Sequence, residues 1–547
     1  MGRQNIARWS RASHVGKKGA VEGCGGWVFA VILAAADQIT RRGTTLKKLL
    51  IVLVVLALLA GGVFYLFSGD GPADPFVADY ELHCLSCHGA ELEGVPGQGP
   101  ALLNVDLRHG TTVAELSKNI ARGFPSEGMP AYVDELTPEE IRGLAIYIAE
   151  RRVDRIFTDF RVDAPIEIPD GIVISDLHNF RVEVVTDQLK PLPFSIAPLP
   201  DGRILVTEKR YGVRIVDPEG NISDTIEGTP EAFDDSIEAI LVWGHGWLLD
   251  IALHPDYAEN GWIYLHHTVR CESCWFPAKS FNRVVRGRIE GGRWVDEQEI
   301  WWPGEEYFSI VPDVAAGGRL AFDDEGYLYI SVGIKGKSNF DGVQDLTKPW
   351  GKIHRIHDDG RVPKNNPFLD TEGAYPTTWT YGHRSPQGLE FEPVTGTVWS
   401  TEMGPRGGDE LNLLQPGRNY GWPLYSLGLN YDGEPVKYGE WLDITFDLND
   451  IEQPVVDFTP APAVSSFIFY QGDQFPRWRR NALITSLKGS ELYRVELDDN
   501  NELVRSEVLL SRLARIRDIE TGPDGNVYLL LEHKSGGQIL RLVPAGE

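Results

Sequence analysis

The sequence predicts an all-β six-bladed propeller that follows a small all-helical domain and one apolar membrane-spanning helix. Three observations support this: a turn-and-strand module recurs six times, a helical segment carries a compact Cys and His motif, and nineteen consecutive residues are uncharged. The sequence therefore divides into a tail at residues 1–45, an anchor at 46–68, a helical domain at 76–153 and the propeller at 173–547.

The net charge of −27 is unevenly distributed along the 547 residues. Residues 1–48 carry nine Lys or Arg and two acidic residues, a balance of +7, so the remainder carries −34. Such an acidic body argues against nucleic acid and against an anionic membrane surface as partners.

Residues 49–67 have no charged side chain, and nineteen residues at about 1.5 Å each match the thickness of the bilayer core. Lys47 and Lys48 precede the run, which predicts a cytoplasmic N-terminus. We expect a single-pass protein of a bacterial inner membrane, with all later domains on the periplasmic or extracellular side. A cleaved signal peptide is the alternative, but the run is long for one and no A-x-A site follows.

Cys84, Cys87 and His88 form a C-x-x-C-H motif of the kind that attaches haem covalently. Met129 lies 41 residues after His88. The segment from Ala78 to about Arg152 resembles a small class I c-type cytochrome, including a helix expected at residues 138–151. The resemblance implies haem c bound through Cys84 and Cys87, with His88 and Met129 as iron ligands. Such a ligand pair raises the iron potential, which suits an electron acceptor. The alternative is Met129 as a core residue.

From about Val173 the pattern changes to short strands of aromatic and β-branched residues, each after an acidic or Pro-Gly turn. The six copies of the module begin at Leu199, His254, Phe322, Phe391, Ala482 and Gly522. Six copies predict six blades, and a strand at residues 180–185 ahead of the first copy is expected to pair into the last blade. A sandwich or lectin-like assembly is the alternative.

Residues 381–423 concentrate glycines, carboxylates and aromatic residues around Gly404 and Pro405. Carbonyls and carboxylates in such a loop suit calcium, and Arg384 suits an anionic or quinone oxygen. The stretch closely resembles the soluble pyrroloquinoline quinone (PQQ) dependent glucose and aldose sugar dehydrogenases. The resemblance implies Ca²⁺ held by Gly404, Pro405, Asp409, Glu410 and Tyr420. A merely structural calcium loop is the alternative.

The resemblance covers about residues 182–542 and includes segments near Lys352, Lys488 and Arg515. PQQ carries three carboxylates and an ortho-quinone, so an acidic protein must collect basic side chains around it. The resemblance implies that PQQ is bound by His245, Arg384, Ser385, Lys488, Arg515 and Arg517.

Three positions depart from the family pattern. Ser385 stands where the family has asparagine, and Ala315 stands where the family has its catalytic histidine. His245 occupies a position usually held by glutamine. We therefore expect His245 to be the catalytic base, with Arg384 beside the reacting oxygen.

Cys271 and Cys274 form a second C-x-x-C pair, but Trp275 follows it, so it is no haem site. Outside the cytoplasm a disulfide is expected. A metal site with His266 and His267 is the alternative.

Together these features predict a membrane-anchored quinohaemoprotein dehydrogenase. It would oxidise a sugar or other alcohol with PQQ and Ca²⁺ and pass electrons to its own haem c and then to a respiratory acceptor. A propeller that has lost catalysis and serves as a ligand-binding or sensing module is the alternative, which Ala315 favours.

Overall fold

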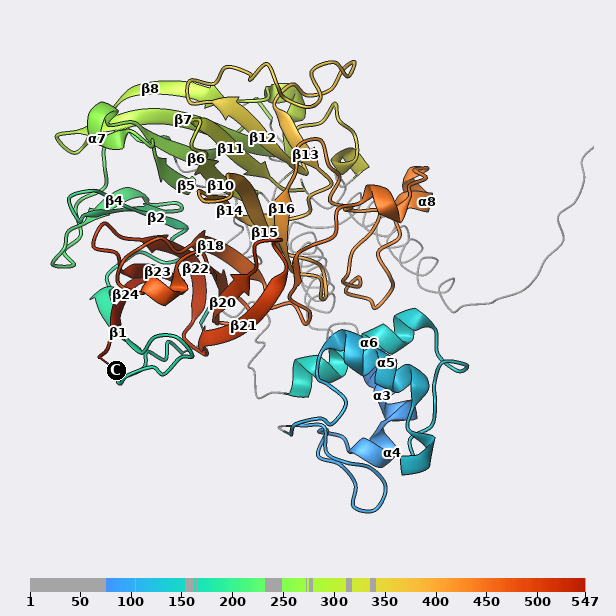
Figure 1. Ribbon diagram of the computed structural model, residues 1–547. Coiled ribbons are helices and arrows are strands. Elements are labelled where there is room, and N and C mark those ends of the chain that lie inside the picture. The colour runs from blue at the N-terminus through green and yellow to red at the C-terminus, as the bar shows by residue number, and fades with distance from the viewer. Residues whose placement is uncertain are drawn as a thin grey trace, which may run out of the picture. The chain divides into compact units, whose positions relative to one another are not determined.

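Six antiparallel sheets follow one another around a ring in the computed structural model of the chain (Figure 1). The structure describes residues 75–103, 105–152, 162–163, 165–231, 248–271, 273–274, 279–310, 317–334 and 341–546. Residues 74–547 form one compact unit. The predicted tail at residues 1–45 and the anchor at 46–68 lie outside the described residues. In the part of the chain that is described, no helix is long and apolar enough to span a bilayer.

Each sheet is a meander of neighbouring strands, except that the last also takes up the first strand of the chain. In blade order the strands are β2 (Ser195–Pro198), β3 (Ile204–Glu208) and β4 (Gly212–Val216); β5 (Leu248–Leu253), β6 (Ile263–Arg270), β7 (Lys279–Glu290) and β8 (Arg293–Trp301), with β9 (Ser309–Ile310) beside β7; β10 (Gly317–Phe322), β11 (Tyr327–Val332), β12 (Lys352–His357) and β13 (Thr378–Tyr381); β14 (Pro386–Glu392), β15 (Thr397–Glu402), β16 (Glu410–Leu414) and β17 (Val456–Asp457); β18 (Val464–Phe469), β19 (Ala482–Ser486), β20 (Leu492–Leu497) and β21 (Leu503–Leu510); and β22 (Arg515–Thr521), β23 (Val527–Glu532) and β24 (Gln538–Pro544).

The recurring module of the sequence corresponds to the second strand of each sheet, namely β3, β6, β11, β15, β19 and β23. The first strands β2, β5, β10, β14, β18 and β22 contact their neighbours in succession, and β22 contacts β2. The predicted six-bladed propeller is therefore confirmed.

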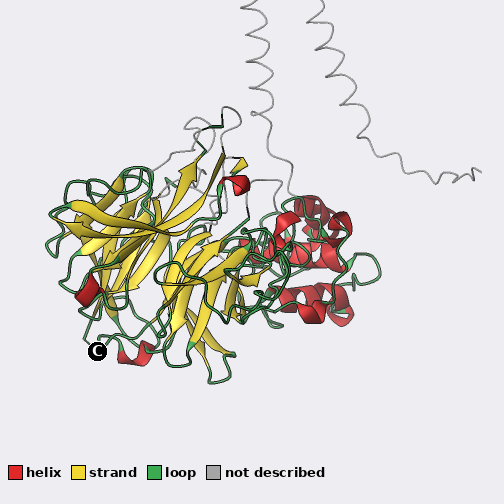
Figure 2. Cartoon of the chain, turned by 90° about the horizontal axis from the view of Figure 1, so that it is seen from above, coloured by secondary structure: helices red, strands yellow, loops and turns green. Residues whose placement is uncertain are grey.

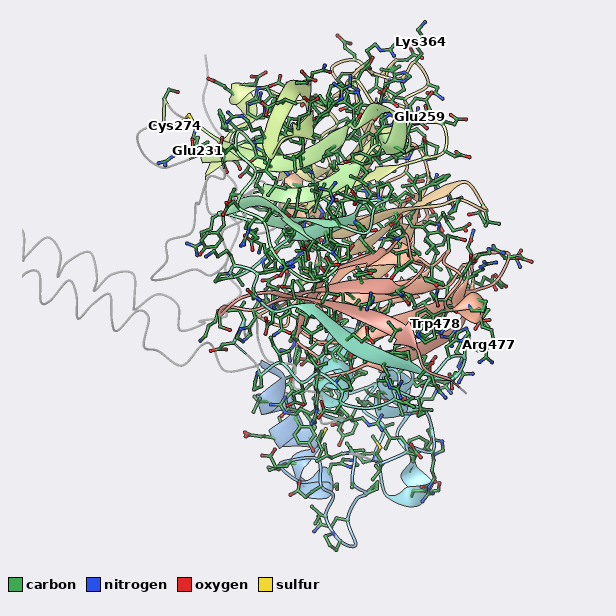
Figure 3. All side chains as sticks on the ribbon, turned by 90° about the vertical axis from the view of Figure 1, so that its left-hand side faces the viewer. Glu231, Glu259, Cys274, Lys364, Arg477 and Trp478 are labelled. Atoms are coloured by element: carbon green, nitrogen blue, oxygen red, sulfur yellow. A yellow bond between two sulfur atoms is a disulfide. The ribbon has the colours of Figure 1, made fainter. Side chains whose placement is uncertain are left out.

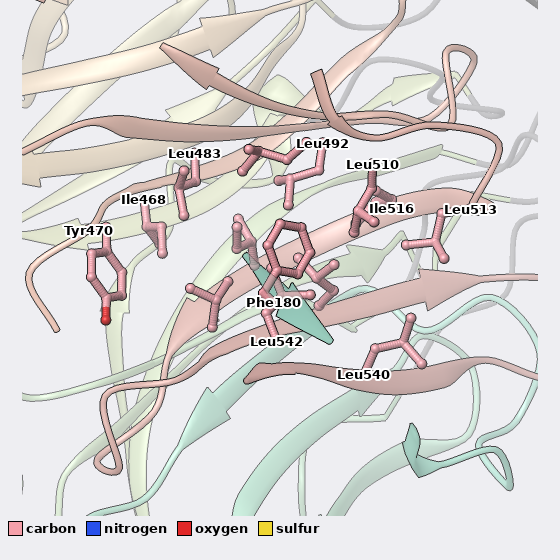
Figure 4. Close-up of a cluster of buried hydrophobic side chains, with 14 of the residues drawn as sticks. Phe180, Ile468, Tyr470, Leu483, Leu492, Leu510, Leu513, Ile516, Leu540 and Leu542 are labelled. Carbon is pink, nitrogen blue, oxygen red and sulfur yellow. The ribbon is translucent and has the colours of Figure 1, made fainter. Parts of the chain in front are cut away.

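The ring is closed by β1 (Phe180–Thr186), which pairs antiparallel with β24 and places Val182 opposite Leu542. This confirms the predicted closing strand. Phe180 is fully buried in an apolar cluster with Leu492, Leu510 and Ile516, which belong to the last two blades (Figure 4). The N-terminal end of the propeller thus ties its two C-terminal blades together.

The segment before the propeller is helical, and its helices are drawn in red in Figure 2. Thr112 and Thr137 each begin a helix with a capping box, in which the threonine and a glutamate three residues later exchange hydrogen bonds with backbone N–H groups. The helices of this segment are α3 (Pro75–His83), α4 (Leu85–His88), α5 (Val113–Arg122) and α6 (Pro138–Arg152); α7 (Tyr257–Asn260) and α8 (Gly439–Leu442) lie in propeller loops. The structure thus confirms the predicted helix at residues 138–151 within α6.

Cys271, just after β6, is joined to Cys274 by a disulfide, and Figure 3 labels Cys274. This confirms the predicted pairing. His266 accepts a hydrogen bond from Asn282 at 2.8 Å inside the same sheet.

Arg319 of β10 joins several inner strands at the propeller centre. Its guanidinium donates to Asp250 of β5 at 3.2 Å and to Asp518 of β22 at 2.7 Å. It also donates to the carbonyl oxygens of Gln387 and Arg517. Asp518 in turn accepts from the Ile196 N–H of β2 at 2.8 Å. One arginine and one aspartate therefore link five of the six blades.

Two further carboxyl groups, Glu390 and Glu520, lie near this ion pair on β14 and β22. Burial, reinforced by Asp250 and Asp518, raises the pKa of Glu390 to about 8. The Glu390 carboxylate accepts a hydrogen bond only from the Phe391 N–H among the described contacts, at 3.0 Å. The folded protein therefore favours the protonated form of Glu390.

We expect Glu390→Gln to change how stability depends on pH. Because the pKa of Glu390 is raised in the folded state, its contribution to stability is complete below about pH 4.5 and is lost as the pH rises towards 8. Glutamine has no such dependence, so the variant should gain in melting temperature relative to the wild type between pH 5 and pH 9. Thermal unfolding at several pH values measures this. Glu372→Gln, at an exposed position, is the control; parallel profiles for wild type and Glu390→Gln would contradict the assignment.

Candidate functional site

The haem motif and the distant methionine line one cavity of about 420 Å³ in the helical domain. Cys84 precedes α4, Cys87 and His88 lie in it, and Met129 follows a short 3-10 turn (Pro125–Glu127). Backbone hydrogen bonds in both directions between Phe124 and Met129, at 2.9 and 3.2 Å, fix the methionine loop. The structure thus brings together all four residues predicted to bind haem.

His88 is oriented by a hydrogen bond from its Nδ1 to the carbonyl oxygen of Pro100 at 2.9 Å. Because a carbonyl oxygen can only accept, Nδ1 carries the proton and Nε2 keeps its lone pair. Burial raises the pKa of the Cys84 thiol to about 12. Two thiols, an imidazole with a free lone pair and a thioether around one cavity fit a covalently bound haem.

The loop after β15 contains the predicted calcium carbonyls. Arg384 donates from Nη1 to the carbonyl oxygens of Met403 at 3.0 Å and Gly404 at 2.9 Å. A Cβ on Gly404 would lie 2.3 Å from the Gly407 carbonyl oxygen, so the tight turn requires glycine. A cation at the Gly404 carbonyl would therefore lie close to the Arg384 guanidinium.

Asp409 determines the position of this loop. One of its carboxylate oxygens accepts from the Gly404 N–H and the other from the Val464 N–H, both at 2.9 Å. Burial raises the pKa of Asp409 to about 7. Asp409 therefore joins the candidate calcium loop to the start of β18.

The remaining predicted calcium ligands lie in different surroundings. The Glu410 carboxylate is half-buried and accepts from Asn412, and burial together with Glu402 raises its pKa. The Tyr420 hydroxyl donates to the Leu413 carbonyl at 2.6 Å. In the described ranges no group of three or more His, Cys, Asp or Glu side chains is placed to hold a metal. The predicted calcium site rests on the carbonyls of Gly404 and Pro405.

A buried cationic cluster lies at the ends of β3, β22 and β23. Arg517 donates from Nε to Glu532 at 2.5 Å, the Arg515 Nε lies 3.7 Å from the same carboxylate, and the Lys209 Nζ lies 3.9 Å from it. All four side chains are less than a tenth exposed. Burial alone would raise the pKa of Glu532, but Arg517, Lys209 and Arg515 lower it well below its usual value. Three cations thus share one carboxylate.

The cluster contains polar atoms without a hydrogen-bond partner. The Nε and Nη1 atoms of Arg515 are buried and donate to no atom of the described structure. The same is true of the Nε atom of Arg384, which lies outside the cluster. Leaving a buried donor unpaired costs about 1 to 3 kcal/mol, more for a charged group. Burial lowers the pKa of Lys209 to about 7, although Glu532 opposes this. These groups are arranged for an anion that brings acceptor oxygens.

A chain of hydrogen bonds, through side chains and backbone N–H groups, connects this cluster with the backbone of Arg384. Arg517 donates to Gln387 Oε1 at 3.2 Å, and Gln387 donates to the Ser385 hydroxyl at 3.1 Å. The Ser385 N–H donates to Glu402 at 3.1 Å, and the Arg384 N–H donates to the same carboxylate oxygen. Three of the predicted cofactor residues, Arg384, Ser385 and Arg517, thus belong to one network.

Lys488 is half-buried in the turn after β19. The neighbouring N–H groups of Leu487 and Gly489 donate to the carbonyl oxygens of Ala463 and Pro462. Those residues directly precede Val464, which Asp409 holds. The turn of Lys488 is therefore tied to the same strand end as the calcium loop.

Four further residues belong to this site but were not predicted from the sequence: Lys209, Gln387, Glu402 and Glu532. A signal was present: the first, fourth and sixth modules end in Glu208, Glu402 and Glu532. All three glutamates are buried at the C-terminal ends of second strands and accept hydrogen bonds from nearby donors. A repeated glutamate at the same position of a propeller module indicates an internal ion pair, and Lys209 directly follows the first of them. The predicted base His245 and the substituted position Ala315 lie outside the described residues.

Known protein families match both parts of the chain. The family model described as Glucose / Sorbosone dehydrogenase matches residues 191–541, and that of cytochrome c oxidase, cbb3-type, subunit III matches residues 72–148. The chain is 35% identical over 373 residues to the aldose sugar dehydrogenase YliI of Escherichia coli, with 66% of this chain and 93% of the relative covered. It is 26% identical over 449 residues to quinoprotein glucose dehydrogenase B of Acinetobacter calcoaceticus, with 68% and 89% covered.

Solved structures show the same similarity. A glucose dehydrogenase aligns with 34% identity and a TM-score of 0.58, covering 67% of this chain and 99% of that one. The soluble aldose sugar dehydrogenase of Escherichia coli in its apo form aligns with 33% identity and the same TM-score, covering 67% of this chain and all of the other. The chain therefore belongs to the glucose/sorbosone dehydrogenase family, whose homologous members are oxidoreductases acting on CH–OH groups, and carries a cytochrome c domain ahead of its propeller.

Proposed function

We propose that this protein is a membrane-anchored quinohaemoprotein that oxidises a sugar or other alcohol with PQQ and Ca²⁺ and passes the electrons to its own haem c. The observation that carries the proposal is the excess of buried cationic groups around Glu532, with the unpaired donors of Arg515. Two guanidinium groups and an amine buried around one carboxylate would be balanced by a multiply charged anionic ligand.

When bound, PQQ would supply a quinone that takes two electrons from the substrate carbon, and haem would accept them one at a time. Arg515, Arg517, Lys209 and Lys488 would hold the carboxylates by charge-assisted hydrogen bonds. Arg384 already reaches the Gly404 carbonyl, so it is placed to orient a quinone oxygen beside a calcium ion on that carbonyl. His245 would remove the substrate hydroxyl proton.

The localisation we propose is a bacterial inner membrane, with residues 46–68 as anchor and both folded domains outside the cytoplasm. The Cys271–Cys274 disulfide supports it, since disulfides persist in oxidising compartments. The cytochrome domain supports a respiratory acceptor as the next electron carrier.

A propeller without catalysis remains the second candidate, because Ala315 replaces the histidine expected at that position. In that case the same cationic cluster would bind an anion without oxidising a substrate. Turnover of aldoses by the wild type separates the two.

First, each chain should carry one covalent haem, visible as a pyridine haemochrome after denaturation. Met129→Ala should keep the haem and lower its reduction potential, because the thioether stabilises ferrous iron. Met403→Ala, outside the haem cavity, is the matched control and should leave the potential unchanged. Protein matured with the cytochrome assembly machinery but free of covalent haem would contradict the assignment.

Second, Arg515→Gln should weaken PQQ binding by about two to three orders of magnitude, since it removes one partner of a buried charge cluster. Equilibrium dialysis of the apo-protein with calcium present measures the affinity. Arg479→Gln removes the same charge from an exposed site and is the control. Unchanged affinity in Arg515→Gln would place the cofactor elsewhere.

Third, His245→Ala should reduce turnover by about two to four decades while the PQQ affinity stays nearly constant, as expected for loss of a general base. Steady-state kinetics over a panel of aldoses, with PQQ titration in parallel, measures both. If the wild type oxidises none of them and Ala315→His alone restores sugar oxidation, the non-catalytic candidate is correct.

A further inference from the structure

Helix α6 is buried on two sides, which is unusual for the outer helix of a small domain. On one side Ile141, Leu144 and Ile148 pack into the helical domain, and Ile148 lines the haem cavity. Ile146 is also fully buried, although its position falls on another face of the helix. The residues on that face are Glu139, Arg142, Ile146 and Glu150. Each of them lies close to the propeller or forms a hydrogen bond or ion pair with it.

Charged contacts lie along this face. Glu150 pairs with Arg406 at 2.9 Å, and both side chains are less than a fifth exposed. The Arg142 Nε donates to the Leu427 carbonyl oxygen at 2.8 Å. Glu139 pairs with Lys437 at 2.9 Å at an exposed edge. Two of the three contacts are largely buried, so they fix one geometry instead of a loose electrostatic association.

Apolar packing surrounds the same contacts. The Arg406 guanidinium lies 4.5 Å from the centre of the Phe76 ring of α3. Leu429 is buried in the apolar cluster of the helical domain, and Arg406 and Leu429 exchange both backbone hydrogen bonds. A Cβ on Gly407 would lie 3.4 Å from Ile146 Cδ1. Helices α3 and α6 therefore enclose the backbone of residues 406–407.

The enclosed segment is part of the candidate calcium loop. Gly404, at one end, presents its carbonyl to Arg384, and Asp409, at the other end, fixes the Gly404 N–H. Arg406 lies between them and bonds Glu150, two residues after Ile148 of the haem cavity. One loop of six residues thus serves the proposed quinone site and the contact with the cytochrome.

We infer that the α6 face formed by Glu139, Arg142, Ile146 and Glu150 is the contact through which electrons leave the propeller for the haem, with Arg406 and Glu150 as its positioning pair. The inference rests on the proposed function for the identity of the electron donor. The contact keeps the haem cavity at a constant separation from the calcium loop, and electron transfer depends steeply on that separation.

A zero-length cross-link tests the contact without any assumption about activity. Carbodiimide should join Glu139 to Lys437 through an amide, and peptide mass spectrometry detects the product. The Asp163 and Lys534 pair, at 2.6 Å, serves as internal control in every sample. Glu150→Arg should abolish the Glu139–Lys437 product and retain the control product. Glu183→Arg, which breaks the Arg541–Glu183 pair of β1 and β24, should retain both.

Rapid kinetics of the holoenzyme then tests the consequence. Glu150→Arg should slow sugar-driven haem reduction by about tenfold or more, while reduction of a small dye that takes electrons from the propeller itself stays within about twofold. Glu150→Arg combined with Arg406→Glu should restore part of the haem rate, because the pair is rebuilt with opposite charges. Glu150→Gln is the milder variant if the reversal lowers the yield of folded protein.

The outcomes separate this inference from the proposed function. A wild type whose haem is never reduced by sugar, but which forms the Glu139–Lys437 product, retains the contact and contradicts the dehydrogenase. A wild type without that product, or a Glu150→Arg variant that loses the product and keeps its haem reduction rate, overturns the inference.

Discussion

The buried pairing of Arg319 with Asp250 and Asp518 is the interaction on which the propeller geometry depends. A propeller has no continuous sheet, so its blades are held by packing and by whatever crosses the central channel. Arg319 crosses it, because its donors reach side chains or carbonyls of β5, β14 and β22, and Asp518 reaches β2. A guanidinium suits this position, since it offers five donors in a fixed plane and keeps its charge when buried. The nearby carboxyl groups of Glu390 and Glu520 have raised pKa values, because they are buried beside other acidic side chains.

The proposed cofactor region shows the opposite condition, because its buried basic side chains outnumber its carboxylates. Glu532 satisfies Arg517 closely but Arg515 and Lys209 only at longer range. Protein interiors normally pair their buried charges, and unpaired donors there indicate a missing ligand atom. The same residues that make the site suitable for an anion therefore cost stability when no anion is bound.

The loop at residues 404–409 combines both conditions. Asp409 at its last position accepts the N–H of Gly404 at its first, Arg384 donates to the Gly404 carbonyl from outside the loop, and Arg406 extends from the loop to Glu150 of the cytochrome domain. Its glycines allow the close approach, since a side chain at Gly404 would collide with backbone oxygen. A loop so constrained by neighbours on both sides has little freedom to move independently. This gives a physical reason to place electron transfer between the domains at this point.

The sequence by itself determined the elements whose signals are local. The C-x-x-C-H motif, the six modules, the closing strand and the capped helix α6 depend on residues close together in the chain, and the structure has each of them. The family motifs predicted five residues of the proposed PQQ site: Arg384, Ser385, Lys488, Arg515 and Arg517. Only the tertiary structure decided which charges share a partner. Lys209 and Glu532 are separated by more than 300 residues in the chain. Arg319 and Asp518 are separated by nearly 200 residues, and Glu150 and Arg406 by 256. A local pattern can mark a position such as Glu532 as charged, but it does not identify the partner, because the pairing arises from the closure of the ring and the packing of α6.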